Sequence, residues 1–349
     1  MKHRKQLGVT IVSLLTVFAL ISPVTQATAA PKKFKLCVGL GGIPGLVGLL
    51  GPTTDGIAKA GAKARGWDYY ERNNKLDAAT TMKNADLFIQ QKCSALLFFA
   101  GPTDALAAKF AKAKIPVITY DLPRKGWYFL GIDNAQAGFE GGKALGNIIK
   151  AEWNCQPDLI LNSHGYGVGI VDAMRSGGMS EGIKAVCPDI DPKKFKDFEG
   201  SGSIEVSSPA ARDILAANPA AKKIAAVGLN DAGVVGVIQA ARQLGSDYKV
   251  LGWGQDGNLI TGDKVDPDLK GSVLYFLEGY SSYAFSLLDE MAAGKKPPMR
   301  DAATNPAVLV KPCPVTAAQA ATLPLAEARA VAGAKKPKSN LYNMYCPKK

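Results

Sequence analysis

Apolar strand-like runs alternate with amphipathic helical stretches along this chain, and the alternation restarts near its middle. The first series covers about residues 34–131, and the second covers about residues 134–251. Nearly continuous apolar strands that alternate with helices are typical of parallel sheets covered by helices on both faces. The sequence therefore predicts an α/β fold with two similar lobes, each built on one such sheet. We expect strands at residues 34–40, 67–71, 95–99, 116–120, 128–131, 158–162, 196–198, 224–228, 249–251, 272–275 and 307–311.

The first 29 residues have the pattern of a secretion signal. A basic start is followed by the apolar run Val9–Ile21 and by the small residues Ala27-Thr28-Ala29 of a cleavage site. The apolar run is shorter than the roughly 20 residues of a membrane span, which favours a cleaved signal over an uncleaved anchor. Cleavage after Ala29 leaves about 320 residues, enough for two domains. No Leu-x-x-Cys lipobox stands at the cut, so we expect a free periplasmic protein.

The charge balance argues against nucleic acid as a partner. The net charge is +12, and three of these positive charges lie in the signal, so +9 remains on the rest of the chain. The basic residues are dispersed among acidic ones, except in the tail beyond Lys335. Nucleic-acid binding would need a basic stripe with aromatic residues or a known motif, and the sequence has neither. Weak attraction to anionic surfaces is the simpler interpretation.

All six cysteines follow the signal, and an exported protein can form disulfides. The pair Cys155–Cys187 is favoured, because one residue precedes a predicted strand and the other follows the next helix, at the same edge of the sheet. A Cys313–Cys346 pair would tie down the C-terminal tail. Cys37 lies inside a predicted strand, where it either pairs with Cys93 or stays free as a small buried hydrophobic residue.

Three kinds of chemistry fit the sequence poorly. Gly39 and Gly41 follow a strand, but Pro44 stands where a dinucleotide-binding motif needs its third glycine, and the helix begins too late. A hydrolase triad would have to use His164, the one histidine beyond the signal, and no Gly-x-Ser-x-Gly motif accompanies it. The cysteines show no paired Cys-x-x-Cys spacing for zinc. We therefore expect no catalytic residues, no metal and no cofactor.

Polar side chains instead gather where predicted strands end. In an open parallel sheet, ligands bind beyond the carboxyl ends of the strands. Carboxylates, amides and a guanidinium there supply the acceptors and donors that sugar hydroxyls need. His164 is either a further ligand contact or a hydrogen-bonding residue of its loop, and any single aspartate could instead cap a helix or form a turn, Asp231 in particular. The candidates from this pattern are Asp121, Asp133, Asn134, Arg175, Asn230, Asp231 and Asp256.

Several motifs in a fixed order carry a resemblance to a known family. They are Ile115–Asp121, Gly131-Ile132-Asp133-Asn134 with Gly138, Arg175–Met179, Gly228-Leu229-Asn230-Asp231, and Gly252 with Asp256-Gly257. Over roughly Phe34–Lys311 the chain resembles the type I periplasmic sugar-binding proteins, of the ribose-binding-protein kind, that feed ABC transporters.

The resemblance implies two α/β lobes that are joined by a three-strand hinge and close on a sugar. The crossovers would fall near Ile132–Asn134, near Leu274–Phe276 and before Ala307. The implied boundaries are a signal at residues 1–29, an N-terminal lobe at 30–133 plus 276–303, a C-terminal lobe at 134–275 plus 304–313, and a C-terminal extension at 314–349.

The same resemblance assigns roles to individual residues. Asp121, Arg175, Asn230 and Asp256 would contact the ligand, and Tyr275 would occupy the hinge position where relatives often carry Gln.

The chain also departs from the family pattern. The first loop lacks the aromatic residues that stack on the sugar in relatives, and Trp253, Trp127 or Tyr166 are candidates for a replacement ring face. The three residues Trp253-Gly254-Gln255 are inserted before Asp256.

These observations predict a monomeric periplasmic receptor that captures a sugar or polyol and delivers it to an ABC transporter permease in the inner membrane. The alternative is a sensory binding protein that presents its ligand to a chemoreceptor or a sensor kinase. An exported enzyme and a transcriptional repressor of the same fold are less favoured, because the histidine content is low and the N-terminus reads as a signal.

Overall fold

The computed structural model describes residues 33–40, 52–75, 77–99, 104–261, 264–277, 280–323 and 346. The chain divides into two units, Met1–Lys33 and Phe34–Lys349, and all elements below belong to the second. The predicted secretion signal and the first loop, at residues 41–51, lie outside the described residues. Among the described helices, none is long and apolar enough to span a membrane.

Two six-stranded sheets form the framework, and their strand orders match position by position. In spatial order, the first sheet contains β13 (Val308–Val310), β5 (Tyr128–Ile132), β4 (Val117–Tyr120), β3 (Ala95–Phe98), β1 (Lys35–Gly39) and β2 (Asp68–Glu71). The second contains β14 (Cys313–Thr316), β10 (Leu269–Leu274), β9 (Lys249–Asp256), β8 (Lys223–Gly228), β6 (Leu159–His164) and β7 (Phe195–Glu199). All described pairings in the two sheets are parallel except β14 with β10, which is antiparallel.

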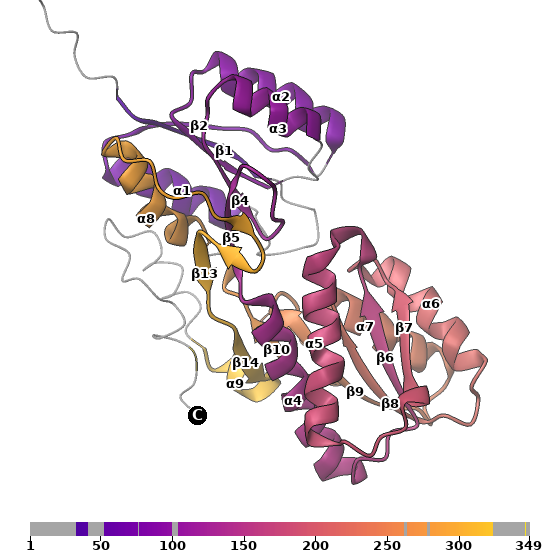
Figure 1. Ribbon diagram of the computed structural model, residues 1–349. Helices are drawn as coiled ribbons and strands as arrows, with labels where there is room; N and C mark the ends of the chain where they lie inside the picture. Colours follow the sequence, from indigo (N-terminus) through magenta and orange to yellow (C-terminus); the bar gives the residue numbers. More distant parts are fainter. Residues whose placement is uncertain are drawn as a thin grey trace, which may run out of the picture. The chain divides into compact units, whose positions relative to one another are not determined.

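Helices cover both faces of each sheet. We call the first sheet with its helices the N-terminal lobe and the second the C-terminal lobe. In the N-terminal lobe, α1 (Pro52–Ala64) and α8 (Tyr280–Ala292) pack on one face, and α2 (Ala78–Gln90) and α3 (Asp104–Lys112) pack on the other (Figure 1). Successive strand residues point to opposite faces, so Leu36 joins the α1–α8 side of the core while Cys37 joins the α2–α3 side.

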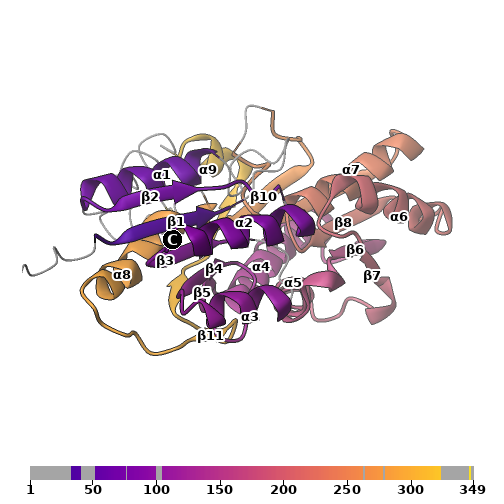
Figure 2. The ribbon, with the colours of Figure 1, turned by 90° about the horizontal axis from the view of Figure 1, so that it is seen from above.

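The C-terminal lobe is built in the same way. The helices α4 (Asn134–Trp153) and α5 (Ile170–Val186) pack on one face, and α6 (Ile204–Ala216) and α7 (Asp231–Leu244) pack on the other. Figure 2 shows the strands of the second sheet between these two helix pairs. The short helix α9 (Ala317–Ala321) packs beside β14 and β10. These two lobes confirm the predicted fold class.

Helices α4 and α5 are in backbone contact because both present glycine at their interface. A Cβ atom on Gly142 would lie 2.1 Å from the carbonyl oxygen of Met179, and one on Gly182 would lie 2.2 Å from that of Phe139. No other residue fits at this separation, since real Cβ atoms do not approach backbone so closely. The close approach brings the start of α4 beside the residues of α5 that follow its first turn.

Three connections run between the sheets, from β5 to α4, from β10 to α8 and from β13 to β14. The third lies later than predicted. Val308–Val310 pairs with β5 in the first sheet, although residues 304–313 were expected in the C-terminal lobe. Cys313–Thr316 pairs with β10, so the first residues of the extension expected at 314–349 belong to a strand of the second sheet. The sequence of so short an apolar strand does not indicate which of the two sheets it joins.

Two further details differ from the sequence-based expectation. The strand expected at residues 249–251 continues to Asp256, so Trp253-Gly254-Gln255 is part of β9. The structure also forms all three candidate disulfides, Cys37–Cys93, Cys155–Cys187 and Cys313–Cys346. Cys37 is therefore bonded, and the alternative of a free thiol is wrong.

Candidate functional site

Two aspartates end equivalent strands of the two sheets. Asp121 follows β4 and Asp256 ends β9, which hold the same position in their sheets. Both have a left-handed backbone, with φ of 59° at Asp121 and 81° at Asp256. Few residues other than glycine adopt this conformation, and such strain collects at functional sites. The two aspartates therefore hold equivalent positions and conformations at the carboxyl edges of the two sheets.

Arg175 on α5 links the first of these aspartates to the start of α4. Its Nη2 donates to both carboxylate oxygens of Asp121, at 2.9 and 3.0 Å, and its Nε donates to Asn134 Oδ1 at 2.6 Å. Arg175 is 5% exposed; burial alone would lower its pKa, but the neighbouring Asp121 carboxylate outweighs this effect and raises it. The Nδ2 donor of Asn134 is buried without a protein partner. Buried donors are nearly always satisfied, so this unpaired amide is unusual.

Two tyrosines of the segment that joins β10 to α8 lie near Arg175 and Asp121. The guanidinium carbon lies 4.6 Å from the centre of the Tyr275 ring, and Tyr280 donates from its hydroxyl to Asp121 Oδ1 at 3.4 Å. The Tyr275 hydroxyl donates to Gln255 Oε1 at 2.7 Å, and Gln255 Nε2 donates to the carbonyl of Gly228 at 3.0 Å. Gln255 and Tyr280 were not predicted, because their contacts depend on which strands and helices become neighbours.

Asp231 and Asp256 form a buried acidic pair in the C-terminal lobe. Burial raises the pKa of Asp231 to about 7, although Ser272 Oγ and the Leu259 N–H donate to its carboxylate. Burial and the charge of Asp231 raise the pKa of Asp256 well above its ordinary value, and the Arg175 charge partly opposes this. The pair therefore binds protons more readily than surface aspartates do, and each protonated carboxyl gains a donor.

Two predicted site residues cap helices. Asp133 accepts from the Gln136 N–H at the start of α4, and Asn230 accepts from the Gly233 N–H at the start of α7. Asn230 also donates from Nδ2 to the Gly202 carbonyl at 2.8 Å. Asp231, which was considered as the cap of α7, is instead the first residue of that helix.

His164 ends β6 and lies in a separate acidic network. Its Nδ1 lies 2.7 Å from Asp172 Oδ2, and its Nε2 lies 3.2 Å from Asp197 Oδ1. Burial alone would lower the pKa of His164, but the hydrogen bonds to these two carboxylates raise it to about 9. The imidazole is therefore a cation near neutral pH, which does not suit a general base.

The structure thus brings four predicted residues into direct contact, Asp121, Asn134, Arg175 and Tyr275. Asp256 interacts with Arg175 through its charge, and Asp172 connects His164 to the helix that carries Arg175. No cluster of metal-binding side chains occurs among the described residues.

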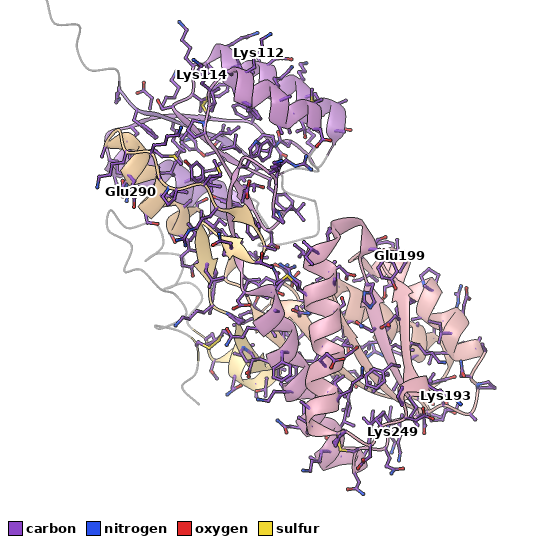
Figure 3. All side chains as sticks on the ribbon, viewed as in Figure 1. Lys112, Lys114, Lys193, Glu199, Lys249 and Glu290 are labelled. Carbon is purple, nitrogen blue, oxygen red and sulfur yellow. A yellow bond between two sulfur atoms is a disulfide. The ribbon has the colours of Figure 1, made fainter. Side chains whose placement is uncertain are left out.

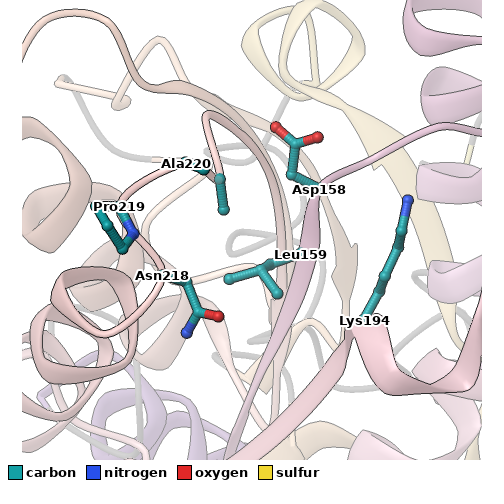
Figure 4. A pocket seen from close by; sticks show the side chains of 7 residues that line it. Asp158, Leu159, Lys194, Asn218, Pro219 and Ala220 are labelled. Atoms are coloured by element: carbon teal, nitrogen blue, oxygen red, sulfur yellow. The ribbon is translucent and has the colours of Figure 1, made fainter.

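A cavity of about 320 Å³ lies at the opposite edge of the second sheet. Figure 4 shows Asp158, Lys194 and Asn218 among its lining side chains. Asp158 accepts from the backbone N–H groups of Lys222 and Lys223, where β8 begins. The cavity is therefore at the amino ends of the strands and is not part of the candidate site.

Comparison with known proteins identifies a family to which this chain is similar. A family model described as a periplasmic binding protein domain matches residues 52–296. A search of curated proteins found no match.

Solved structures share the fold at low sequence identity. An ABC transporter periplasmic solute binding protein from Actinobacillus succinogenes 130z, solved with bound D-allose, is 18% identical, with 82% of this chain and 99% of that chain covered and a TM-score of 0.64. A structure from Mycobacterium smegmatis in complex with β-D-fucofuranose is 20% identical, with coverages of 86% and 97% and a TM-score of 0.62. The transcription regulator CcpA of Lactococcus lactis is 17% identical, with coverages of 81% and 98% and a TM-score of 0.61.

The family model covers most of the chain, and the two-sheet architecture is shared with the solved structures. The chain therefore belongs to the periplasmic binding protein family and has the type I, ribose-binding-protein-like fold that its motifs predicted.

Proposed function

We propose that this protein is a periplasmic receptor that captures a sugar or sugar-like polar molecule between its two lobes and delivers it to an ABC transporter permease. The observation that carries the proposal is the contact of Arg175 with Asp121 and Asn134. It joins side chains of both lobes and of the first connection around one guanidinium. Vicinal hydroxyl groups are bound well by paired donors and acceptors that are held in a fixed geometry.

The acceptors and donors at the site suit a neutral polyhydroxyl ligand. The carboxylates of Asp121 and Asp256 accept hydrogen bonds from hydroxyls, while Arg175 and the unpaired Nδ2 of Asn134 donate to hydroxyl oxygens. Relatives of the same fold were solved with D-allose, β-D-fucofuranose and myo-inositol, which supports this ligand class. The matching family model is described as a periplasmic binding protein domain, which supports binding rather than catalysis.

Capture would favour a closed arrangement of the lobes. A ligand shifts such an equilibrium only by its difference in affinity between the two states, and contacts from both lobes supply that difference. The periplasmic location, the monomeric state and the permease partner are part of this proposal, supported by the family and by the signal-like start of the sequence.

A thermal-shift screen of the protein without residues 1–29 tests the proposal. The compounds are D-allose, D-fucose, L-arabinose, myo-inositol and glycerol, with amino acids as the opposing class. A ligand at one hundred times its dissociation constant should raise the free energy of unfolding by about 2.7 kcal/mol. Stabilisation by amino acids alone, or by no compound, would reject the proposed ligand class.

The variant Arg175→Lys tests the site. Lysine keeps the charge but loses the planar fork, so the affinity for any ligand found should fall about 10- to 100-fold. The matched control is Arg65→Lys, because Arg65 also donates to a carboxylate, that of Asp289, at 2.6 and 2.9 Å, but within the N-terminal lobe. Equal affinities of the two variants would exclude Arg175 from the site.

A further inference from the structure

The position of Arg175 depends on the helix that carries it. Its guanidinium bonds to Asp121 and Asn134 at 2.6 to 3.0 Å, so a small displacement of α5 would lengthen these bonds beyond the hydrogen-bonding range. Val171 in the same half of α5 lies in an apolar cluster with Phe129 of β5. Contacts of the residues on either side of Arg175 therefore act on the site.

Asp172 joins the first turns of α5 to the end of β6. The side chain is buried, and its Oδ2 lies 2.7 Å from His164 Nδ1. Its Oδ1 accepts from the Gly165 N–H at 2.9 Å and from Ser176 Oγ at 2.8 Å. Residues three and four apart share one side of a helix, so Asp172 and Ser176 lie on one side of the turn that carries Arg175. One carboxylate therefore links this turn to the last residue of β6 and to the residue that follows it.

Asn162 makes a second link between the same two elements. This β6 residue donates from Nδ2 to the Ser176 carbonyl at 3.1 Å and to Asp197 Oδ1 of β7 at 3.0 Å. Asn162 is buried, and buried hydrogen bonds are costly to leave unmade. The end of β6 thus holds α5 through two residues, one three positions before Arg175 and one directly after it.

His164 is itself fixed on several sides. Its Nε2 lies 3.2 Å from Asp197 Oδ1, and the ring of Tyr166 stacks on the imidazole with the ring centres 4.8 Å apart. Because its raised pKa makes the imidazole a cation, both contacts with aspartates are charge-assisted and stronger than hydrogen bonds between neutral groups. Both ring nitrogens face carboxylates, which favours a role through these partners over direct contact with a ligand.

This network lies at the carboxyl edge of the second sheet. His164 pairs in register with Glu199 of β7. Figure 3 shows Glu199 at the end of this lobe opposite Lys193 and Lys249, and Lys249 begins β9. Because Asp256 ends β9, the network and the candidate site share one edge of the sheet.

We propose that His164 is a positioning residue of the ligand site, which acts through Asp172 to hold the turn of α5 that carries Arg175. This inference rests on the proposed function and adds to it a residue that touches no ligand atom. Without the imidazolium, the Asp172 carboxylate keeps only neutral donors, which hold the turn less firmly. The guanidinium would then sample positions in which its bonds to Asp121 and Asn134 are not made together.

Calorimetric titration of wild type, His164→Asn, Arg175→Lys and the double variant with D-allose and myo-inositol tests this role. His164→Asn should weaken binding about 3- to 10-fold, within the range of coupling between residues of one hydrogen-bonded network. In the Arg175→Lys background the same change should weaken binding less than about 2-fold, because the fork that it misplaces is already absent. A general loosening of the lobe would instead weaken binding by the same factor in both backgrounds.

A nitrogen–proton correlation spectrum gives a readout that needs no ligand. The Nε–H signal of Arg175, identified by its absence in Arg175→Lys, reports the 2.6 Å bond to Asn134. This signal should shift or broaden in His164→Asn. The matched control is Ser207→Ala, which removes the buried hydrogen bond from Ser207 Oγ to the Gly233 carbonyl, between α6 and α7 on the other face of the sheet. The control should leave both the signal and the affinity unchanged.

Equal losses of affinity in the two backgrounds, or an Arg175 signal that is unchanged in His164→Asn, would overturn the inference while the proposed function stands. A signal that shifts equally in Ser207→Ala would overturn it as well, because any loss of a buried bond in the lobe would then suffice. If wild type binds none of the sugars and cyclitols of the thermal-shift screen, the proposed function fails. The Arg175 signal then decides the positioning role by itself.

Discussion

At the residue scale, the site combines strained backbone with buried charge. Asp121 and Asp256 have left-handed conformations, and Asp231 and Asp256 are buried as an acidic pair. The positive φ angles cost folding free energy that glycine at these positions would not, and the buried carboxyls cost free energy that neutral amides would not. Such costs are common where side chains are kept for binding. The aspartates themselves could be predicted from sequence, because they follow apolar runs. Their backbone conformation could not, since many residues at strand ends are extended.

The variant Asp256→Gly should therefore separate stability from binding. Glycine relieves the positive φ of 81° and removes a buried carboxyl whose pKa is raised, so the free energy of unfolding should rise by about 1 kcal/mol. Ligand affinity should fall at the same time. Urea unfolding and calorimetry of the same preparation measure both quantities. A destabilised variant with unchanged affinity would contradict this account of Asp256.

His164 should make stability depend on pH. Its pKa is raised from 6.5 to about 9 on folding, so its ion pairs stabilise the protein fully below pH 6.5 and this contribution is lost as the pH rises through 9. The denaturation midpoint of wild type should fall between pH 6.5 and pH 9.5 more than that of His164→Asn. Parallel pH profiles for the two proteins would show that the Asp172 and Asp197 contacts do not stabilise the imidazolium.

At the scale of elements, the α4–α5 contact is the part of the fold on which the site geometry depends most. Asn134 begins α4 and Arg175 lies on α5, so their 2.6 Å hydrogen bond requires the two helices to meet closely. The glycines that permit this contact can be read in the sequence, but the sequence does not show which helix packs against them. In the same way, the strand at residues 308–310 could be predicted, whereas its pairing with β5 depends on a contact made far along the chain.

Adding one methyl group to this interface should therefore be costly. In Gly142→Ala the new Cβ would meet the Met179 carbonyl at 2.1 Å, which forces the helices apart and should lower the free energy of unfolding by about 1–3 kcal/mol. Gly177→Ala on α5 is the control, because its Cβ would meet nothing within 4 Å and alanine favours a helix. Chemical denaturation of both variants checks the prediction, which fails if they respond alike.

At the scale of the whole molecule, repetition made the architecture predictable. Two series of strands and helices gave two lobes, and the two sheets have matching strand orders. Motifs along the chain also predicted the family that the comparison shows. What could not be predicted was the set of residues around Arg175, since Tyr280 and Gln255 come from segments that are far from Arg175 in the sequence.

If one ligand is held jointly by both lobes, a substitution in either lobe should weaken its binding. Calorimetric titration of Asp121→Asn and Asp256→Asn with a compound that binds wild type tests this. Asp121 belongs to the N-terminal lobe and Asp256 to the C-terminal lobe. We predict one binding site per chain in wild type and a loss of affinity of about 10-fold or more in each variant. Wild-type affinity in either variant, or two independent sites, would show that the two lobes do not share one ligand.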